Sequence, residues 1–410
     1  MHPSSLNPAP PPSILHQGPF ALFWWARLSS WIAFQMLGVA VGWQVYSLTG
    51  SALYLGFVGL AQFLPMFFLT LAVGHVADRY DRRTIARFCQ IVEGLAAGTL
   101  ALGSFSGWLS KDSILAIVFI SGAARAFEGP TMQALLPRLV PSPVLSRAAA
   151  LSASAMQTAS IVGPALGGLL YACGATAVYV TASILFMAAS LLIALIQLER
   201  APLKREPVSL QSLFAGIAFI RSRRAILGAI SLDLFAVLLG GATALLPIYA
   251  RDILATGPWG LGLLRSAPAA GALAMSVFLA HHPLRRRVGQ IMFCAVAIFG
   301  AVTIVFAIST SFALSLGTLV ILGAADVISV VIRHTLVQIT TPDEMRGRVS
   351  AVNSMFIGTS NQLGEFESGV TAAWFGVVPA VLIGGIGTIL VVIIWMRLFP
   401  ELLRTDSLDR

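Results

Sequence analysis

Long apolar stretches recur along almost the whole chain, and they constrain its fold more than any other feature. A helix needs roughly 20 predominantly apolar residues to cross the ~30 Å hydrocarbon core of a bilayer. About twelve segments reach that length, and short loops rich in Gly, Pro and Asp separate them. They are 20–48, 52–76, 84–108, 113–136, 146–172, 175–198, 225–249, 258–280, 289–309, 312–336, 349–375 and 378–399.

The composition also places the chain in a membrane. Of its 410 residues, 57% are hydrophobic and 10% are charged, and the mean hydropathy is +0.86, which lies outside the range of soluble domains. Inside hydrocarbon every backbone N–H and C=O must be bonded within the protein, and helices of this length achieve that. We therefore predict an all-α membrane protein with twelve transmembrane helices.

The net charge of +9 would suit a nucleic-acid partner, but the placement of the charges indicates membrane topology instead. One set of alternate loops carries only two basic residues, Lys111 and Arg251. By the positive-inside rule we expect both termini in the cytoplasm of a multi-pass protein of the cell membrane, with lipid and no nucleic acid as partner. The other loops and the tails carry Arg79, Arg82, Arg83, Arg87, Arg138, Arg147, Arg200, Lys204, Arg205, Arg221, Arg223, Arg224, Arg285, Arg286, Arg287, Arg346, Arg348, Arg397, Arg404 and Arg410.

The first nineteen residues and the cysteines add little chemistry. Residues 1–19 are Pro-rich and lack Lys and Arg, which is typical of a disordered tail and not of a cleaved signal peptide. Cys89, Cys173 and Cys294 are scattered, without a CxxC pair or a His at metal spacing. We expect neither a disulfide nor a metal site, and we interpret the cysteines as small packing residues.

An internal repeat divides the chain into two halves. An ungapped offset of 201 places Gly122 on Gly323, and it continues through several pairs of special residues. Two six-helix bundles of parallel topology follow from this repeat. The further pairs are Pro141 with Pro342, Arg147 with Arg348, Gly163 with Gly364 and Gly168 with Gly369.

The repeat also sets the predicted domain boundaries. We expect a cytoplasmic tail at 1–19, bundles at 20–198 and 225–400, a cytoplasmic linker at 199–224 and a second tail at 401–410. Within the linker, Leu210, Leu213, Phe214 and Ile217 follow helical spacing, which predicts an amphipathic helix on the membrane surface. A simple tether and a regulatory element are both open interpretations of this segment.

About ten charged residues lie away from the ends of the predicted spans, inside the membrane. A charge at the bilayer centre costs about 2.5–3.5 kcal/mol on insertion scales, so each needs a partner, water or a function. Helices that carry them are expected to face a polar cavity. The residues are Arg27, Glu93, Arg125, Glu128, Asp233, Arg265, Asp326, Arg333, Glu365 and Glu367.

Asp233 is the leading candidate for a proton-binding site. Its flanks in LDLFAVLL are apolar, and an isolated buried carboxylate can change its charge near neutral pH. The alternative is a permanent ion pair with an arginine, for which Arg27 and Arg265 are the candidates. Arg27 can equally snorkel to the cytoplasmic face.

Other membrane charges are better explained by pairing. Arg125 and Glu128 are one helical turn apart, so we expect them to form an ion pair. Asp326 and Arg333 share a helix face about 10 Å apart in height. Because Asp326 occupies the repeat position of Arg125, we expect the two halves to complement each other across a central cavity. Glu93 is interpreted as structural.

The stretch GPALGG, 163–168, places poor helix formers in the middle of a predicted helix. Glycines allow close helix packing, and Pro164 bends a helix where tertiary contacts satisfy the freed carbonyl. The repeat partner is GEFESG, 364–369, with Glu365 at the position of Pro164 and Glu367 at that of Leu166. Whether Glu365 or Asp233 would take a proton stays open.

Three motifs resemble signatures of the major facilitator superfamily. GHVADRYDRR, 74–83, resembles the loop between helices 2 and 3, and SGAARAFEGP, 121–130, resembles the helix-4 motif, although Glu128 and Pro130 depart from it. GPALGG resembles the helix-5 motif of exporters through Gly163, Pro164, Gly167 and Gly168. The wider pattern over 20–400 is similar to the branch of enterobactin exporters and macrolide efflux proteins.

The resemblance implies the major facilitator fold and a cytoplasmic latch. In the latch, Gly74 would permit close helix packing and Asp78 would hold the end of helix 11, while Arg79, Arg82 and Arg83 would add contacts. It also implies a monomeric secondary transporter that works by alternating access, as a proton-coupled exporter of a siderophore, drug or other amphipathic small molecule in the bacterial cytoplasmic membrane. A uniporter or importer of the same fold, or a channel or receptor, is the alternative.

An enzyme is not expected. The two lysines, Lys111 and Lys204, follow no Gly-rich phosphate loop, so ATP hydrolysis by this chain is excluded. The sequence also lacks an HExxH motif and a GxSxG elbow. No cofactor is implied.

Overall fold

The computed structural model describes residues 18–197, 210–284 and 286–407. The side chains of 70–79, 210–213, 343–344 and 351 lie outside this description, as do residues 1–17 of the predicted first tail, 199–209 of the predicted linker and 408–410 of the second tail. Throughout the described ranges the regular structure is helical. The fold class predicted from the apolar stretches is therefore confirmed.

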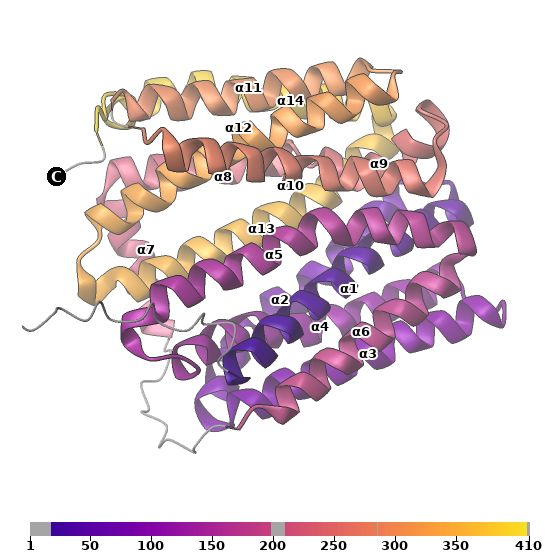
Figure 1. The fold of residues 1–410 in the computed structure, drawn as a ribbon. Helices are drawn as coiled ribbons and strands as arrows, with labels where there is room; N and C mark the ends of the chain where they lie inside the picture. Colours follow the sequence, from indigo (N-terminus) through magenta and orange to yellow (C-terminus); the bar gives the residue numbers. More distant parts are fainter. Residues whose placement is uncertain (1–17, 198–209, 285, 408–410) are drawn as a thin grey trace, which may run out of the picture.

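The helices form two bundles that lie side by side (Figure 1). The N-terminal half occupies the lower part of the view and the C-terminal half the upper part, with α5 and α13 between them. The first half contains α1 (Gly18–Thr49), α2 (Ala52–Arg79), α3 (Arg82–Phe105), α4 (Lys111–Leu135), α5 (Leu145–Leu170) and α6 (Ala175–Leu195). The second contains α8 (Arg224–Leu239), α10 (Gly257–His281), α11 (Val288–Ile308), α12 (Phe312–Thr340), α13 (Asp343–Phe375) and α14 (Val377–Leu398), followed by the short α15 (Pro400–Leu403).

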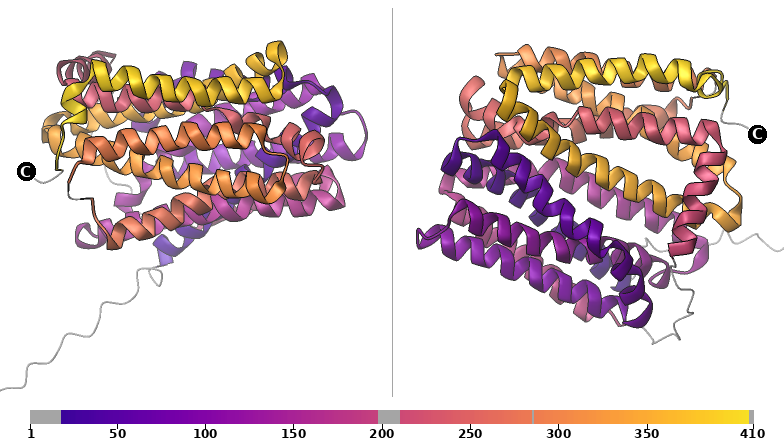
Figure 2. Two further views of the ribbon diagram at one scale, coloured as in Figure 1. Left: turned by 90° about the horizontal axis from the view of Figure 1, so that it is seen from above. Right: turned by 180° about the vertical axis from the view of Figure 1, so that it is seen from behind.

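Two helix pairs make most of the contact between the halves, α2 with α13 and α5 with α10. Under the 201-residue repeat α5 corresponds to α13 and α2 to α10, so the second pair repeats the first with the halves exchanged. The views in Figure 2 show these central helices running between the two bundles. The pseudo-symmetry inferred from the sequence is therefore present in the packing.

Ten helical segments of the described residues are long and apolar enough to cross a membrane. The two long helices outside that group are α5 and α13. Both lie at the interface between the halves, where small and polar residues replace the large apolar residues that contact lipid. Together with them the two bundles contain twelve long spans, as predicted.

The seventh span is broken, which the sequence analysis did not anticipate. α8 ends at Leu239, and the chain continues through η5 (Ala242–Leu245), α9 (Leu246–Ile248) and the π-helical η6 (Tyr249–Ile253). A Cβ on Gly241 would lie 2.3 Å from the carbonyl oxygen of Gly364. The close approach of α13 therefore requires glycine at 241, and Gly240 and Gly241 together interrupt the helix.

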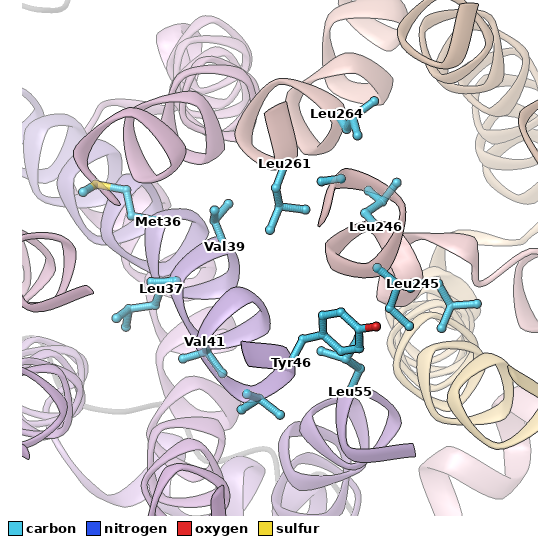
Figure 3. Close-up of a cluster of buried hydrophobic side chains, with 14 of the residues drawn as sticks. Met36, Leu37, Val39, Val41, Tyr46, Leu55, Leu245, Leu246, Leu261 and Leu264 are labelled. Carbon is cyan, nitrogen blue, oxygen red and sulfur yellow. The ribbon is translucent and has the colours of Figure 1, made fainter. Parts of the chain in front are cut away.

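The two ends of the bundles are called the linker end and the far end. The linker end is the end at which α7 (Leu210–Ser222) lies, and the far end carries the turns after α1, α3 and α5. The far half of the interface is lined by apolar side chains, and Figure 3 shows Val39 and Tyr46 of α1 and Leu55 of α2 on the side of Leu245, Leu246 and Leu261 of the C-terminal half. Leu245, Leu246, Leu261 and Leu264 are fully buried there.

The predicted amphipathic helix of the linker is present as α7. Its residues Ile217 and Ile220 pack with Val349 and Val352 of α13. A Cβ on Gly216 would lie 3.0 Å from the carbonyl oxygen of Arg348. α7 is therefore seated on the linker end of α13, a helix of the interface between the halves.

Candidate functional site

A central cavity of about 240 Å³ lies between the two halves. Helices of both halves contribute to its wall, which is mostly apolar. The polar side chains of the wall are few, and they come from Gln35, Gln62, Ser121, Thr243, Arg265 and Glu365. The apolar part comprises Phe34, Leu37, Gly38, Val41, Gly42, Leu55, Val58, Ala96, Ala97, Leu100, Ile117, Val118, Gly122, Pro164, Ala244 and Pro247.

Arg265 and Glu365 are the charged residues of this wall, and both belong to the C-terminal half. Each reaches a glycine of the other half. A Cβ on Gly38 of α1 would lie 2.7 Å from Nη1 of Arg265, and a Cβ on Gly59 of α2 would lie 2.8 Å from Cβ of Glu365. The two glycines thus make room for the two charges inside the interface.

Arg265 and Glu365 interact electrostatically, but within the described ranges no ion pair of 4.0 Å or less joins them. A buried charge without a direct partner is costly. The cavity can therefore bind a molecule that carries complementary groups, and its apolar wall can bury the rest of that molecule.

A second polar cluster lies inside the N-terminal half. Arg125 forms the predicted ion pair with Glu128, and its Nη1 is also 3.9 Å from Oε1 of Glu93. The Glu128 carboxylate accepts hydrogen bonds from the Ser30 hydroxyl at 2.7 Å and from Nε2 of Gln90 at 3.0 Å. The Glu93 oxygens are buried without a hydrogen-bond donor, so Glu93 is held by charge alone.

Aromatic rings enclose the Arg125 guanidinium. Its Cζ lies 4.3 Å from the ring centroid of Trp31 and 4.5 Å from that of Phe34, both within the range of cation–π attraction. Phe34 also lines the central cavity. Arg125 thus sits directly behind the cavity wall and does not line the cavity.

Arg27 lies in the same half and interacts electrostatically with Glu128 and Arg125. Its Nη2 is 2.8 Å from the sulfur of Met156, and its Nε is buried without an acceptor. The charges of this cluster, two arginines and two glutamates, therefore balance.

The C-terminal half contains a third cluster, centred on Asp233. Asp233 is 5% exposed and forms an ion pair with Arg333, which is 2% exposed. The predicted alternative of an arginine partner is therefore correct for Asp233, but the proposed partners Arg27 and Arg265 were wrong. Those two lie on α1 and α10, whereas Arg333 comes from α12, which packs against α8.

Asp326 faces the same cluster across a second, very small cavity of about 10 Å³. Asp233, Asp326 and Ser329 line it together with apolar residues of α8, α11 and α12. The Ser329 hydroxyl is buried without a hydrogen-bond partner. Asp326 thus belongs to a cluster within its own half, so the expectation that Asp326 and Arg125 complement each other across the central cavity was wrong.

The remaining membrane carboxylate, Glu367, lies outside both cavities. The Thr371 hydroxyl donates a hydrogen bond of 2.7 Å to it. The two carboxylates of the GEFESG segment, Glu365 and Glu367, therefore lie in different surroundings. Only Glu365 reaches the central cavity, because the two residues lie on different faces of α13.

The GPALGG segment is a packing element of α5. Gly163 and Gly167 contact Gln35 and Met36 of α1, while a Cβ on Gly168 would lie 2.5 Å from the carbonyl oxygen of Pro258 and 2.9 Å from Cα of Gly262 on α10. Pro164 lines the central cavity. The segment joins α5 to helices of both halves.

Two side-chain hydrogen bonds add to this α5–α10 contact. The Ser266 hydroxyl donates to the carbonyl of Ile161 at 2.6 Å, and Nε2 of Gln157 donates to the carbonyl of Ala269 at 2.6 Å. Ile161 is adjacent to Ser160, whose carbonyl loses its helical donor at Pro164. No spacing in the sequence indicates these partners, because they are more than 100 residues apart.

The predicted latch is described in part. The side chains of Gly74, Asp78 and Arg79 lie outside the described ones. Arg82 donates to the carbonyl of Ala134 at 2.8 Å, and Arg83 donates to that of Ile196 at 2.8 Å. These two arginines therefore tie the start of α3 to the ends of α4 and α6 in the same half.

Asp81, which the sequence analysis passed over, caps α3. Its carboxylate accepts a hydrogen bond from the Arg83 backbone N–H at 2.9 Å and pairs with the Arg83 side chain at 2.8 Å. The Arg83 guanidinium holds the pKa of this carboxyl below its usual value. An Asp directly before a helix is the signal that would have identified it.

Another unpredicted contact joins the halves at the far end. The Tyr46 hydroxyl of α1 donates a hydrogen bond to the Asp252 carboxylate of η6. The Arg251 guanidinium lies 5.5 Å from the centroid of the Tyr46 ring and 3.8 Å from Asp252. No pattern in the sequence connects these residues, since they are about 200 positions apart.

Among the residues that the structure describes, no group of three or more His, Cys, Asp or Glu side chains is placed to hold a metal ion. Cys89, Cys173 and Cys294 are free thiols.

Comparison with known proteins adds sequence relatives. A family model described as transmembrane secretion effector matches residues 9–410. The chain is 28% identical over 398 residues to the enterobactin exporter EntS of Citrobacter koseri, covering 92% of this chain and 91% of that exporter. It is 26% identical over 273 residues to macrolide efflux protein A of Streptococcus pyogenes, covering 63% of this chain and 65% of that protein.

A solved structure shows the same fold. The crystal structure of a bacterial homologue of the human lysosomal transporter Spinster, inward-facing and unoccupied, superposes with a TM-score of 0.70 at 13% sequence identity. The superposition covers 94% of this chain and 95% of the homologue. It supports the two-bundle architecture described above.

Proposed function

This chain belongs to the transmembrane secretion effector family of the major facilitator superfamily, and we propose that within it the protein is a proton-coupled exporter of an amphipathic small molecule. It is a multi-pass membrane transporter and not an enzyme. The observation that carries the proposal is the central cavity, whose apolar wall contains a guanidinium and a carboxylate, Arg265 and Glu365.

The apolar wall and the two charges suit a ligand with a hydrophobic body and a few polar groups. Arg265 would contact an anionic or carbonyl oxygen, and Glu365 would contact a cationic or hydroxyl donor. Two relatives named above are an enterobactin exporter and a macrolide efflux protein, which supports a small-molecule substrate. We therefore place the substrate in this chemical class.

Alternating access is the proposed mechanism. At about 240 Å³ the cavity is below the ~300–1,000 Å³ of typical ligand pockets, so the halves must separate to admit a substrate. The two equivalent contacts, α2 with α13 and α5 with α10, provide surfaces on which one bundle can rock against the other. The apolar far end would open to release the substrate.

The basic residues support one orientation of the chain in the membrane. Arg82, Arg83, Arg221 and Arg346 lie toward the linker end, whereas Lys111 and Arg251 lie toward the far end. By the positive-inside rule we place the linker end and both termini in the cytoplasm of the bacterial cell. An exporter in this orientation would carry its substrate from the linker end to the far end.

The test uses purified protein in proteoliposomes with labelled erythromycin and labelled enterobactin. An imposed pH gradient should drive uphill transport of at least one of them, and an uncoupler should abolish it. Arg265→Gln and Glu365→Gln should each lower transport by about tenfold or more, since each removes a charged contact. Glu367→Gln, outside both cavities, is the control and should transport normally.

Other outcomes would contradict the proposal. Transport that is saturable but unaffected by the pH gradient would indicate a uniporter. Uptake in the opposite direction would indicate an importer. Normal transport by both cavity variants would remove Arg265 and Glu365 from the substrate site.

A further inference from the structure

The Asp233 cluster has an excess of negative charge that the other half does not have. Arg333 pairs with Asp233, and Asp326 lines the same small cavity without a hydrogen bond within the described part of the chain. In the N-terminal half, Arg27 and Arg125 balance Glu93 and Glu128. The C-terminal cluster therefore requires one more positive charge to be neutral.

We propose that Asp326 is the carboxylate that binds the transported proton, beside the Asp233–Arg333 ion pair. This inference rests on the proposed exporter function and assigns its proton-binding residue. Arg333 is the direct cationic partner of Asp233, so the proton goes to Asp326, the carboxylate without such a partner among the described residues. Protonation of Asp326 leaves one carboxylate and one guanidinium, and the cluster becomes neutral.

The surroundings of Asp326 favour a proton over a larger cation. The cavity of about 10 Å³ is close to the smallest space that holds one water molecule. The buried Ser329 hydroxyl lines this cavity and has no hydrogen-bond partner, so it is free to bond to the carboxyl group or to such a water. Hard cations take six or more oxygen ligands, and the cavity wall does not provide them.

Few charged groups act on the two carboxylates, Asp326 and Asp233. Asp326 interacts electrostatically with Asp233 and Arg333. Asp233 interacts electrostatically with Arg333 and also with His334. α11 contributes Val296 and Phe299 to the cavity wall, which carry no charge. Among the described residues, His334 is thus the one other titratable group that must be tested.

The broken seventh span offers a route from this site to the central cavity. Asp233 lies on α8, which ends at Leu239, and the following η5 contributes Thr243 and Ala244 to the cavity wall. Gly241 lies against the carbonyl of Gly364, next to Glu365. A shift of α8 on protonation of Asp326 would therefore move the wall that contacts the substrate, although the proton and the substrate occupy separate sites.

The experiment compares two transport modes of the reconstituted protein with labelled erythromycin. In exchange, the pH is equal on both sides, whereas in driven transport a pH gradient is imposed. Asp326→Asn should lower driven transport about tenfold or more and keep exchange within about twofold of the wild type. Asp326→Glu should retain driven transport, and His334→Gln and the control Glu367→Gln should behave like the wild type.

A second measurement needs no substrate. Infrared difference spectra of the purified protein, recorded while the pH is changed, report the stretch of a protonated carboxyl group. The band should be present in the wild type and in His334→Gln, and absent in Asp326→Asn. If neither erythromycin nor enterobactin is transported, the proposed function fails while this measurement still tests the proton site.

Several results would overturn the assignment. They are loss of the infrared band in Asp233→Asn with retention in Asp326→Asn, loss of driven transport in His334→Gln, and transport driven by a sodium gradient in place of a pH gradient. Equal loss of exchange and driven transport in Asp326→Asn would also overturn it, because the residue would then serve binding or folding and not coupling.

Discussion

At the scale of single residues, the membrane charges are held in three separate groups. Arg125 and Asp233 each lie in an ion pair with a buried partner, whereas Arg265 and Glu365 face the central cavity without one. Pairing and hydrogen bonding keep the first two clusters stable inside the bilayer. The charges of the cavity wall are the ones left for a ligand.

Arg125 is predicted to be the most sensitive of these residues for stability. Arg125→Met would leave Glu93 and Glu128 buried without their cation, so we expect the free energy of unfolding to fall by about 3–5 kcal/mol. The measurement is unfolding of the purified protein in detergent. Glu93→Gln is the matched variant and should cost less, because the Glu93 oxygens accept no hydrogen bond in the described structure. Equal losses in both variants would contradict this ranking.

At the scale of helices, glycines determine where the two halves meet. Gly168 lies against Gly262 on one side, and Gly369 lies against Gly56 on the other, with a Cβ on Gly369 only 2.6 Å from Cα of Gly56. Gly168 and Gly369 are repeat partners. A glycine packed against a glycine therefore closes both contacts at the far end. The neighbouring atoms belong to the backbone, which cannot move aside as a flexible side chain could.

Gly168→Ala is predicted to weaken the closed far end. Its Cβ would meet backbone atoms of Pro258 and Gly262, so α5 and α10 must separate and the far end should open more often. The measurement is labelling of a single cysteine at Leu261, buried in that contact, which should react faster in the variant. Gly129→Ala is the control, since no atom lies within 4 Å of the added Cβ, and it should leave the labelling rate unchanged. An unchanged rate in Gly168→Ala would refute the prediction.

At the scale of the whole molecule, the far end of the described structure is closed by an apolar core and by a polar contact between the halves. The apolar core holds the interface through buried leucines of α10 and of the broken seventh span. Tyr46 and Asp252 add a hydrogen bond across it. This end must open if transport follows alternating access, so the apolar core must then separate and the Tyr46–Asp252 hydrogen bond must break.

A cysteine pair at Tyr46 and Asp252 is predicted to lock that end. Oxidation of the double variant should abolish transport, and reduction should restore it, because the cross-link prevents the halves from separating. Each single cysteine variant is the control and should be insensitive to oxidant. Undiminished transport by the cross-linked protein would show that the far end need not open. The measurement is transport in proteoliposomes, with cross-linking followed by gel mobility.

The sequence alone determined the spans, the two halves and the residues that carry charge into the membrane. Helix length, hydropathy and the 201-residue repeat are local or linear properties, so they could be read directly. It also predicted the Arg125–Glu128 pair correctly, because neighbours one turn apart are fixed by helix geometry.

Only the tertiary structure decided which distant residues meet. Asp233 pairs with Arg333, 100 positions away, and not with Arg27 or Arg265. Glu365 reaches the central cavity and Glu367 does not, and the seventh span breaks where α13 approaches Gly241. Each of these depends on the rotation of one helix against another, which the close packing of the bundle sets and no spacing within a single helix contains.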